Sequence, residues 1–267
     1  MNSFFYPGLL PEMNFEKRTL LTAVNSKVIM INVINYINQI NMTKELSPIL
    51  KYIADATRQD EPVPSISELS SQLGISTASV REQLEVPKEL GFVEVRTRTG
   101  IQKREFCLTR PLTLSMKYGL RVDPDLFQEY ASLRQQLEIA YWYQACALLE
   151  KNHIKELWKL EERAIRKINQ NPVVIPTLEH REFHLSIYRP LNNRVLNSVL
   201  ETYWELYQAS QINIYRNHEY LESVWSYHHQ MLEAIASKAY EKGYDALVTH
   251  FDLMKTFKKA DLRQRFE

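Results

Sequence analysis

Two short helices separated by a tight turn can be located from their end signals alone. Ser65 and Glu68 form an S-x-x-E capping box that starts a helix. Gly74 stands where a left-handed residue commonly ends a helix, and Ser76 is a suitable N-cap for a second helix directly afterwards. The stretch SISELSSQLGISTASVREQLE therefore predicts helix, turn, helix, preceded by a shorter helix over about residues 48–57.

After this pair the apolar period changes from helical to alternating. Val93 and Val95 alternate with charged residues, Thr99 and Gly100 mark a turn, and IQKREFCL can return as a second strand. Two helices followed by such a hairpin predict a winged helix-turn-helix over residues 46–107. Pro87 is expected to kink or end the second helix.

This arrangement is typical of DNA binding, in which the N-terminal end of the second helix enters the major groove. With a net charge of +1 the chain has no large basic field, so nucleic-acid binding requires a local basic patch. The hairpin supplies one, since no acid stands between Val95 and Arg104. The predicted contacts to double-stranded operator DNA are Ser76, Thr77, Ser79, Arg81, Arg96, Arg98, Gly100, Lys103 and Arg104.

The C-terminal half follows a helical pattern with few glycines and short connections, which favours an all-α antiparallel bundle. Six helices are expected over about residues 125–151, 154–169, 177–189, 194–216, 219–237 and 239–262. The predicted domains are an extension with one helix at about 23–40 (1–45), the winged helix (46–107), a linker punctuated by Pro111 and Pro124 (108–124) and a helical effector- and metal-binding domain (125–267). The expected fold class is mostly α.

Four of the seven histidines stand at informative positions in this half. His180 and His184 are four residues apart, which places both imidazoles on one helix face where they can converge on one ion. His228 and His250 lie in two further predicted helices. The sequence therefore favours a DNA reader joined to a helical sensor with a metal-containing pocket.

Composition narrows the class of protein further. The chain is 45% hydrophobic and 24% charged, which is typical of a globular protein. Two cysteines in 267 residues fit a reducing compartment. The most apolar stretch, VIMINVINYINQINM, is interrupted by asparagines, and the N-terminus lacks a basic segment and a small-residue cleavage site. These features predict a cytoplasmic protein without a membrane span.

The order of these features resembles the GntR superfamily of transcription regulators, and within it the FadR-like branch with an FCD sensor domain. In the recognition stretch Ser76, Val80, Arg81 and Leu84 match the family pattern, whereas Thr77 replaces an arginine. In the sensor half the family's arginine followed by Leu-Glu is seen as Arg134, Leu137 and Glu138, its D-x-x-F-H motif as HREFH, and the following asparagine as Asn193.

The resemblance implies a homodimeric regulator with a metal site formed by His180, His184, His228 and His250. His180 stands where metal-binding members have aspartate, and four imidazoles favour a transition metal such as zinc or nickel. The resemblance also implies a small carboxylate effector bound by Arg134 and Asn193; the alternative for Arg134 is an ion pair within its helix or with another helix. Repression is the commoner habit of the family.

Two other functions remain open at the level of sequence. The winged helix can mediate protein contacts in a helical metal- or ligand-binding protein. A metal-dependent hydrolase is disfavoured, because Glu182 is two positions from His180, about 200° around the helix, and not adjacent as in H-E-x-x-H.

Overall fold

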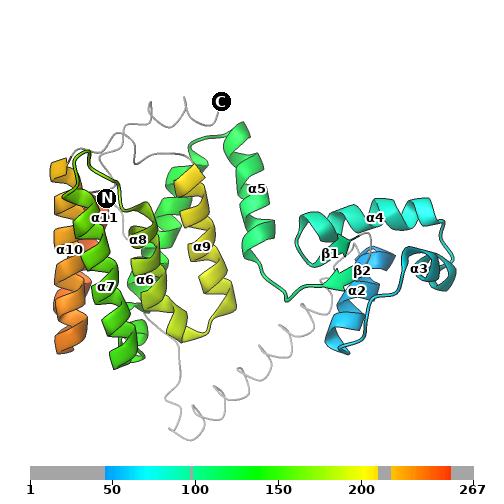
Figure 1. Cartoon of the computed structure of the whole chain (residues 1–267), viewed down its shortest axis with the longest axis horizontal. Coiled ribbons are helices and arrows are strands. Elements are labelled where there is room, and N and C mark those ends of the chain that lie inside the picture. Colours follow the sequence, from blue (N-terminus) through cyan, green and yellow to red (C-terminus); the bar gives the residue numbers. More distant parts are fainter. Residues whose placement is uncertain (1–45, 97–98, 210–217, 254–267) are drawn as a thin grey trace, which may run out of the picture. The chain divides into compact units, whose positions relative to one another are not determined.

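The computed structural model describes residues 46–96, 99–209 and 218–253 (Figure 1). The helix predicted at about 23–40 lies outside these ranges, as do the C-terminal ends of the helices predicted at 194–216 and 239–262. By its packing the chain divides into two compact units, residues 1–54 and 55–267, with the division inside α2 (Pro48–Arg58). The domain boundaries expected from the sequence stay predictions.

The helix–turn–helix begins and ends at the residues that its end signals indicate. In α3 (Ile66–Leu73) the Ser65 side chain accepts from Glu68 N and the Glu68 carboxylate accepts from Ser65 N, so the capping box is confirmed. Gly74 follows in the left-handed conformation with φ of 64°. Ser76 then caps α4 (Thr77–Glu89) by accepting from Ser79 N at 3.1 Å.

Pro87 does not end α4 where the sequence suggested. The helix continues to Glu89, and Leu90 N donates to Val86 O at 2.9 Å. A proline removes one backbone donor, but it stands in the last turn, where the following residues still form their helical hydrogen bonds. Its ring is buried, so Pro87 contributes to the core instead of marking the end of the helix.

The hairpin pairs β1 (Val93–Arg96) with β2 (Gly100–Lys103) in antiparallel register, with Val93 opposite Lys103 and Glu94 opposite Gln102. Side chains alternate between the two faces of a strand. Val93 and Ile101 are buried on one face, and that face also carries Lys103. Glu94, Arg96 and Gln102 are on the other face.

Residues 108–124, predicted as a linker, form a helix, α5 (Thr109–Val122). Both prolines lie at its ends. Pro111 is in the first turn, where backbone N–H groups have no helical acceptor, and the first helical bond is from Leu112 N to Leu108 O. Pro124 follows Asp123, which is extended as the residue before a proline prefers to be. The prolines therefore bracket a helix.

The remaining helices confirm the expected all-α architecture. They are α6 (Leu126–Ala147), α7 (Lys151–Ile168), α8 (Thr177–Tyr188), the 3-10 turn η1 (Arg189–Leu191), α9 (Arg194–Ala209), α10 (His218–Ser237) and α11 (Tyr240–Asp252). α10 packs on α7 and α11, α6 packs on α8, α9 and α11, and α5 lies along α9 (Figure 1). Within the described residues, every helix is too short or too polar to cross a membrane.

Two sides of α9 make different kinds of contact, one apolar and one polar. Leu200, Tyr203 and Trp204 are buried in the apolar core of the bundle. About a third of a turn away, at roughly 100° per residue, Glu201 and Glu205 accept hydrogen bonds from the hydroxyls of Thr109 and Thr113 on α5, at 3.0 and 2.8 Å. α5 is thus attached to α9 by hydroxyl–carboxylate contacts.

Candidate metal centre and DNA-reading surface

The bundle brings all four predicted histidines together. His180 and His184 lie one turn apart on α8, His228 lies on α10 and His250 on α11. Each imidazole is buried, with at most 8% of its surface exposed. One nitrogen from each ring can be chosen so that all four lie within 4.8 Å of one another.

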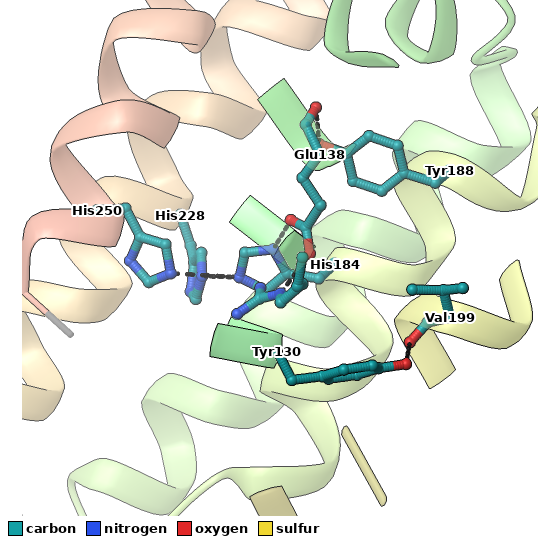
Figure 2. A network of polar contacts seen from close by, with 8 residues as sticks. Tyr130, Glu138, His184, Tyr188, Val199, His228 and His250 are labelled. Carbon is teal, nitrogen blue, oxygen red and sulfur yellow. Dashed lines mark hydrogen bonds and ion pairs between the residues drawn. The ribbon is translucent and has the colours of Figure 1, made fainter. Parts of the chain in front are cut away.

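The spacing of these nitrogens suits a small ion with nitrogen ligands. The Nε2 atom of His184 lies 3.2 Å from Nε2 of His228 and 3.3 Å from Nε2 of His250 (Figure 2). A tetrahedral zinc ion with Zn–N distances of about 2.0–2.1 Å holds its nitrogens about 3.3 Å apart. Two of the contacts in the cluster therefore match the edge of such a tetrahedron.

Hydrogen bonding leaves part of the cluster unsatisfied. The buried atoms His180 Nε2, His228 Nδ1 and His250 Nδ1 have no hydrogen-bond partner among the described residues. A buried polar atom without a partner is unfavourable, by roughly 1–3 kcal/mol. The Nε2 atoms of His228 and His250 both contact Nε2 of His184, which can form a hydrogen bond with only one of them. A metal ion would satisfy these Nε2 atoms better than hydrogen bonds among the rings do.

Burial also sets the charge of the cluster. Desolvation lowers the pKa of His180, His184, His228 and His250 well below the ordinary value, and the nearby Arg134 guanidinium lowers it further. The rings are therefore neutral near pH 7, and neutral imidazole is the form that ligates metals.

A buried carboxylate, that of Glu138, contacts both His184 of this cluster (Figure 2) and Arg134. Glu138 on α6 is fully buried, and its Oε2 lies 2.7 Å from His184 Nδ1. Its Oε1 accepts from Arg134 Nε at 2.5 Å. In the sequence, Glu138 stands out only by its place in the family pattern, although its spacing of four residues from Arg134 on a helix is a signal for this ion pair.

Arg134 has the intrahelical ion pair that the sequence left open, and it is only 2% exposed. Its guanidinium carbon lies 4.6 Å from the ring centroids of Tyr203 and Trp204. Burial pulls the pKa of Arg134 down, but the opposite charge of Glu138 raises it, so Arg134 remains a cation. Burial raises the pKa of Glu138 against the effect of the same guanidinium. We take the pair as ionised, because Arg134 keeps its charge within 2.5 Å of the carboxylate.

Asn193 is not brought to the cluster. Its Oδ1 accepts from Leu196 N at 3.0 Å, which caps the first turn of α9. Trp204, whose ring lies 4.7 Å from that of His180, is eleven residues further along α9, about 16 Å at 1.5 Å per residue. The predicted pairing of Arg134 with Asn193 around one small ligand therefore finds no support in the geometry.

Two other acidic residues near the histidines belong to separate contacts. Glu182 forms ion pairs with Arg181 and Arg189, and is not among the buried groups of the cluster. Glu161 on α7 lies 2.7 Å from Nδ1 of His229, which is next to His228 in sequence but half exposed. His229 is thus outside the candidate ligand set.

The N-terminal end of α4 presents the residues predicted to read DNA. Thr77 and Arg81 are exposed, Ser79 is half-buried, and Ser76 is exposed while its hydroxyl caps the helix. Val80 and Leu84 of the same helix are buried. The exposed side chains of Thr77 and Arg81 at the start of α4 can therefore contact a partner.

The basic hairpin residues that the structure describes form ion pairs with Glu94 and Asp60. Glu94 forms ion pairs with Arg96 and with Arg104, and all three lie on the outer face of the hairpin. Lys103 lies on the inner face, where it contacts Asp60 at 3.2 Å and Ala56 O at 3.3 Å. Arg98 lies outside the described residues, and Gly100 is exposed with a positive φ of 72°. The predicted patch is thus divided between the two faces of the hairpin.

Comparison with known proteins agrees with this architecture. Residues 129–253 match the FCD domain family. A search of curated proteins found no match to this sequence. Among solved structures, Streptococcus agalactiae GntR superposes with a TM-score of 0.56 at 17% identity, over 78% of this chain and 96% of that one.

Two further structures give lower scores. E. coli McbR/YncC has a TM-score of 0.44 at 20% identity, over 84% of this chain and 100% of that one. A GntR family member from Pseudomonas syringae pv. tomato has a TM-score of 0.38 at 21% identity, over 81% of both chains. Of these three, the streptococcal protein alone exceeds 0.5, and at its identity the match shows a shared fold.

Proposed function

We propose, on the premise that residues 129–253 form an FCD domain, that this chain is a ligand-responsive transcription regulator that binds DNA. The observation that carries the proposal is one chain holding both a helix–turn–helix with a wing and a buried four-histidine cluster within the FCD region. The first is the arrangement that enters a DNA groove. The second is a site that can respond to a small molecule.

For DNA binding, the proposal assigns base-edge contacts to the exposed start of α4, with Arg81 as its cation. Arginine reads guanine through two parallel hydrogen bonds. The outer face of the hairpin, with Arg96 and Arg104, would contact phosphates. Exposed ion pairs such as those with Glu94 are worth about 0–1 kcal/mol, so phosphates can compete with that carboxylate for both arginines.

For the metal, the proposal assigns His180, His184, His228 and His250 as ligands of one divalent transition ion, zinc or nickel. Support comes from the neutral, buried nitrogens, from the convergence of Nε2 of His184, His228 and His250, and from the unpartnered Nε2 of His180. When bound, the ion supplies a positive centre that can orient a small carboxylate. Arg134 adds a second positive group, because its buried Nη2 has no hydrogen-bond partner in the described structure.

For assembly, the proposal is a homodimer that reads two half-sites of an operator, since one reading head covers one half-site. A ligand changes operator affinity by as much as its affinity differs between the two states of the sensor. We expect repression that is released or modulated by the effector.

The DNA proposal is tested by selecting duplexes from a randomised library and measuring their affinity by fluorescence anisotropy. We expect a dimer to bind the selected DNA, with an affinity that falls steeply as salt rises because phosphate contacts release counterions. Addition of small carboxylates, from acetate to malate and citrate, should shift this affinity for at least one of them. Failure to enrich any duplex would favour a winged helix used for protein contacts.

The metal proposal is tested by elemental analysis of the purified protein beside a His184→Ala, His228→Ala double variant. We expect about one zinc or nickel ion per chain, absent from the variant. The same metal content in both proteins would place the ion elsewhere. No metal in either, even after incubation with zinc or nickel, would overturn the four-histidine site and leave DNA binding standing.

A further inference from the structure

We propose that Glu138 is a positioning residue for the histidine cluster, setting its affinity for metal by fixing the ring of His184. This inference deepens the proposed function, because it rests on the metal site but not on DNA binding. Its basis is the pair of contacts that Glu138 makes from a fully buried position, one to a histidine of the cluster and one to a permanent cation.

The contact with Glu138 determines which nitrogen of His184 carries the proton. A carboxylate only accepts hydrogen bonds, so His184 Nδ1, at 2.7 Å from Glu138 Oε2, must be the N–H. Nε2 of the same ring then keeps its lone pair. That atom is the one that lies 3.2 and 3.3 Å from His228 and His250.

Glu138 remains a hydrogen-bond acceptor in the core because it is paired with a cation. Ionised carboxylates are unfavourable in an apolar interior unless they are paired and hydrogen-bonded. Arg134, one helical turn earlier on α6, donates from Nε at 2.5 Å. Its guanidinium packs against the rings of Tyr203 and Trp204. The pair gives Glu138 a charge and a fixed orientation.

The four histidines differ in whether a carboxylate holds the ring. In the described structure, the second ring nitrogens of His228 and His250 have no partner, and neither has Nε2 of His180. Only His184, among these four, is held by a carboxylate. Histidine ligands that donate their other N–H to a carboxylate have a fixed tautomer and higher basicity, and losing the carboxylate typically weakens metal binding 10–100-fold. Among these four histidines, His184 is therefore the one whose ring is oriented by a carboxylate, that of Glu138.

The molecule also contains a matched carboxylate–histidine pair outside the cluster. Glu161 Oε1 lies 2.7 Å from His229 Nδ1, the same separation as between Glu138 and His184. His229 is half exposed and is not part of the four-histidine set. The Glu161→Gln variant is therefore a control for the loss of a carboxylate near a histidine.

The test is the zinc affinity of the full chain, measured by competition with a chromophoric chelator. For Glu138→Gln we expect zinc binding about 10–100-fold weaker than in wild type, and for Glu161→Gln an unchanged affinity. In a His184→Ala background, Glu138→Gln should change the residual affinity by less than about twofold, because its effect passes through His184. Wild-type affinity in Glu138→Gln, or an equal loss in Glu161→Gln, would overturn the proposal.

A measurement on the wild-type chain keeps the proposal testable if Glu138→Gln does not fold. With ¹⁵N-labelled histidine and zinc, NMR correlation of ring nitrogens and ring protons reports the tautomer of each imidazole, and His184 is assigned by its absence from His184→Ala. We expect His184 protonated at Nδ1. A His184 ring protonated at Nε2, or a wild-type chain that binds no zinc, would remove this role from Glu138, while operator binding would be unaffected.

Discussion

Glu138 and Glu94 each bridge two basic partners, but in opposite surroundings. Glu138 lies in the core of the helical domain with none of its surface exposed, between Arg134 and His184. Glu94 lies on the outer face of the hairpin with 31% of its side chain exposed, between Arg96 and Arg104. Each glutamate contacts two basic side chains, so a difference between the two networks in their contribution to stability reflects burial and not the number of contacts.

Exposure to solvent determines how easily the ion pairs of each network can be exchanged for other partners. Water and salt screen the contacts of Glu94, so its arginines can exchange it for another anion at little expense. Glu138 has no such alternative, because an unpaired charge in the core is strongly unfavourable. The buried network is therefore suited to hold a site in one geometry, and the exposed one to release its cations to a partner.

The largest expected effect is on stability. Glu138→Ala leaves Arg134 buried without its partner, and we expect a loss of about 3–5 kcal/mol in the free energy of unfolding. Glu94→Ala should lose at most about 1 kcal/mol. Urea denaturation of metal-free protein, followed by circular dichroism, measures both. Equal losses in the two variants would show that burial is not what distinguishes the networks.

The pH dependence of stability should come from the buried region, because residues 46–107 contain no histidine. The folded-state pKa of the four cluster histidines is lowered, so below about pH 6.5 the unfolded chain binds more protons and stability falls as pH falls. Between pH 6.5 and 5.5 each ring contributes up to about 1 kcal/mol of this loss in metal-free protein. The raised pKa of Glu138 acts in the opposite direction.

Urea denaturation at several pH values measures this loss, with a histidine variant for comparison. His228→Gln should reduce the slope of stability against pH, because it removes one buried neutral ring. Stability that stays constant from pH 7 to 5.5 would contradict burial of four neutral rings.

On the exposed side, Arg81→Ala should weaken binding to selected DNA by about 1–3 kcal/mol and relax the preference for one base, if Arg81 reads a guanine edge. Fluorescence anisotropy against the selected duplex and its single-base variants measures both effects. Arg163→Ala is the control, because Arg163 is an exposed arginine on α7 in the helical domain. A uniform loss across all sequences would assign Arg81 to phosphate contact instead.

The smallest expected effect is a gain in DNA affinity. Glu94→Gln releases Arg96 and Arg104 from their carboxylate, and we expect DNA affinity to rise by less than about 1 kcal/mol. The dependence of affinity on salt should become steeper, since more phosphate charge is neutralised. Unchanged affinity and salt dependence would mean that these arginines do not contact DNA.

The sequence predicted well those features that depend on local signals. The caps at Ser65 and Ser76 and the turn at Gly74 are properties of a few neighbouring residues, and the structure confirms them. The convergence of four histidines was predicted from one helical spacing and from the family resemblance, and the structure brings the rings together. Prolines were misleading because their effect depends on position within a helix, as at Pro111 and Pro87.

Features that depend on distant partners could not be read from the sequence. The alternation of a strand puts Lys103 on the opposite face from Arg104, and Asp60 is more than forty residues away from it. The contact of Glu138 with His184 joins two helices, and no local pattern predicts which helices pack together. Asn193 was assigned by resemblance alone, and its side chain caps α9.

The two sides of α9 have a mechanical consequence. One side carries Tyr203 and Trp204 against Arg134, and the other carries the carboxylates that hold Thr109 and Thr113 of α5. A helix of 16 residues is a rod about 24 Å long that rotates as one body. A displacement of the rings on one side therefore moves the carboxylates on the other, and hydrogen bonds tolerate such movement less than apolar contacts do because they are directional. Along the chain, α5 is the first helix after the hairpin, so a movement of α9 would reach the helix that directly follows the wing.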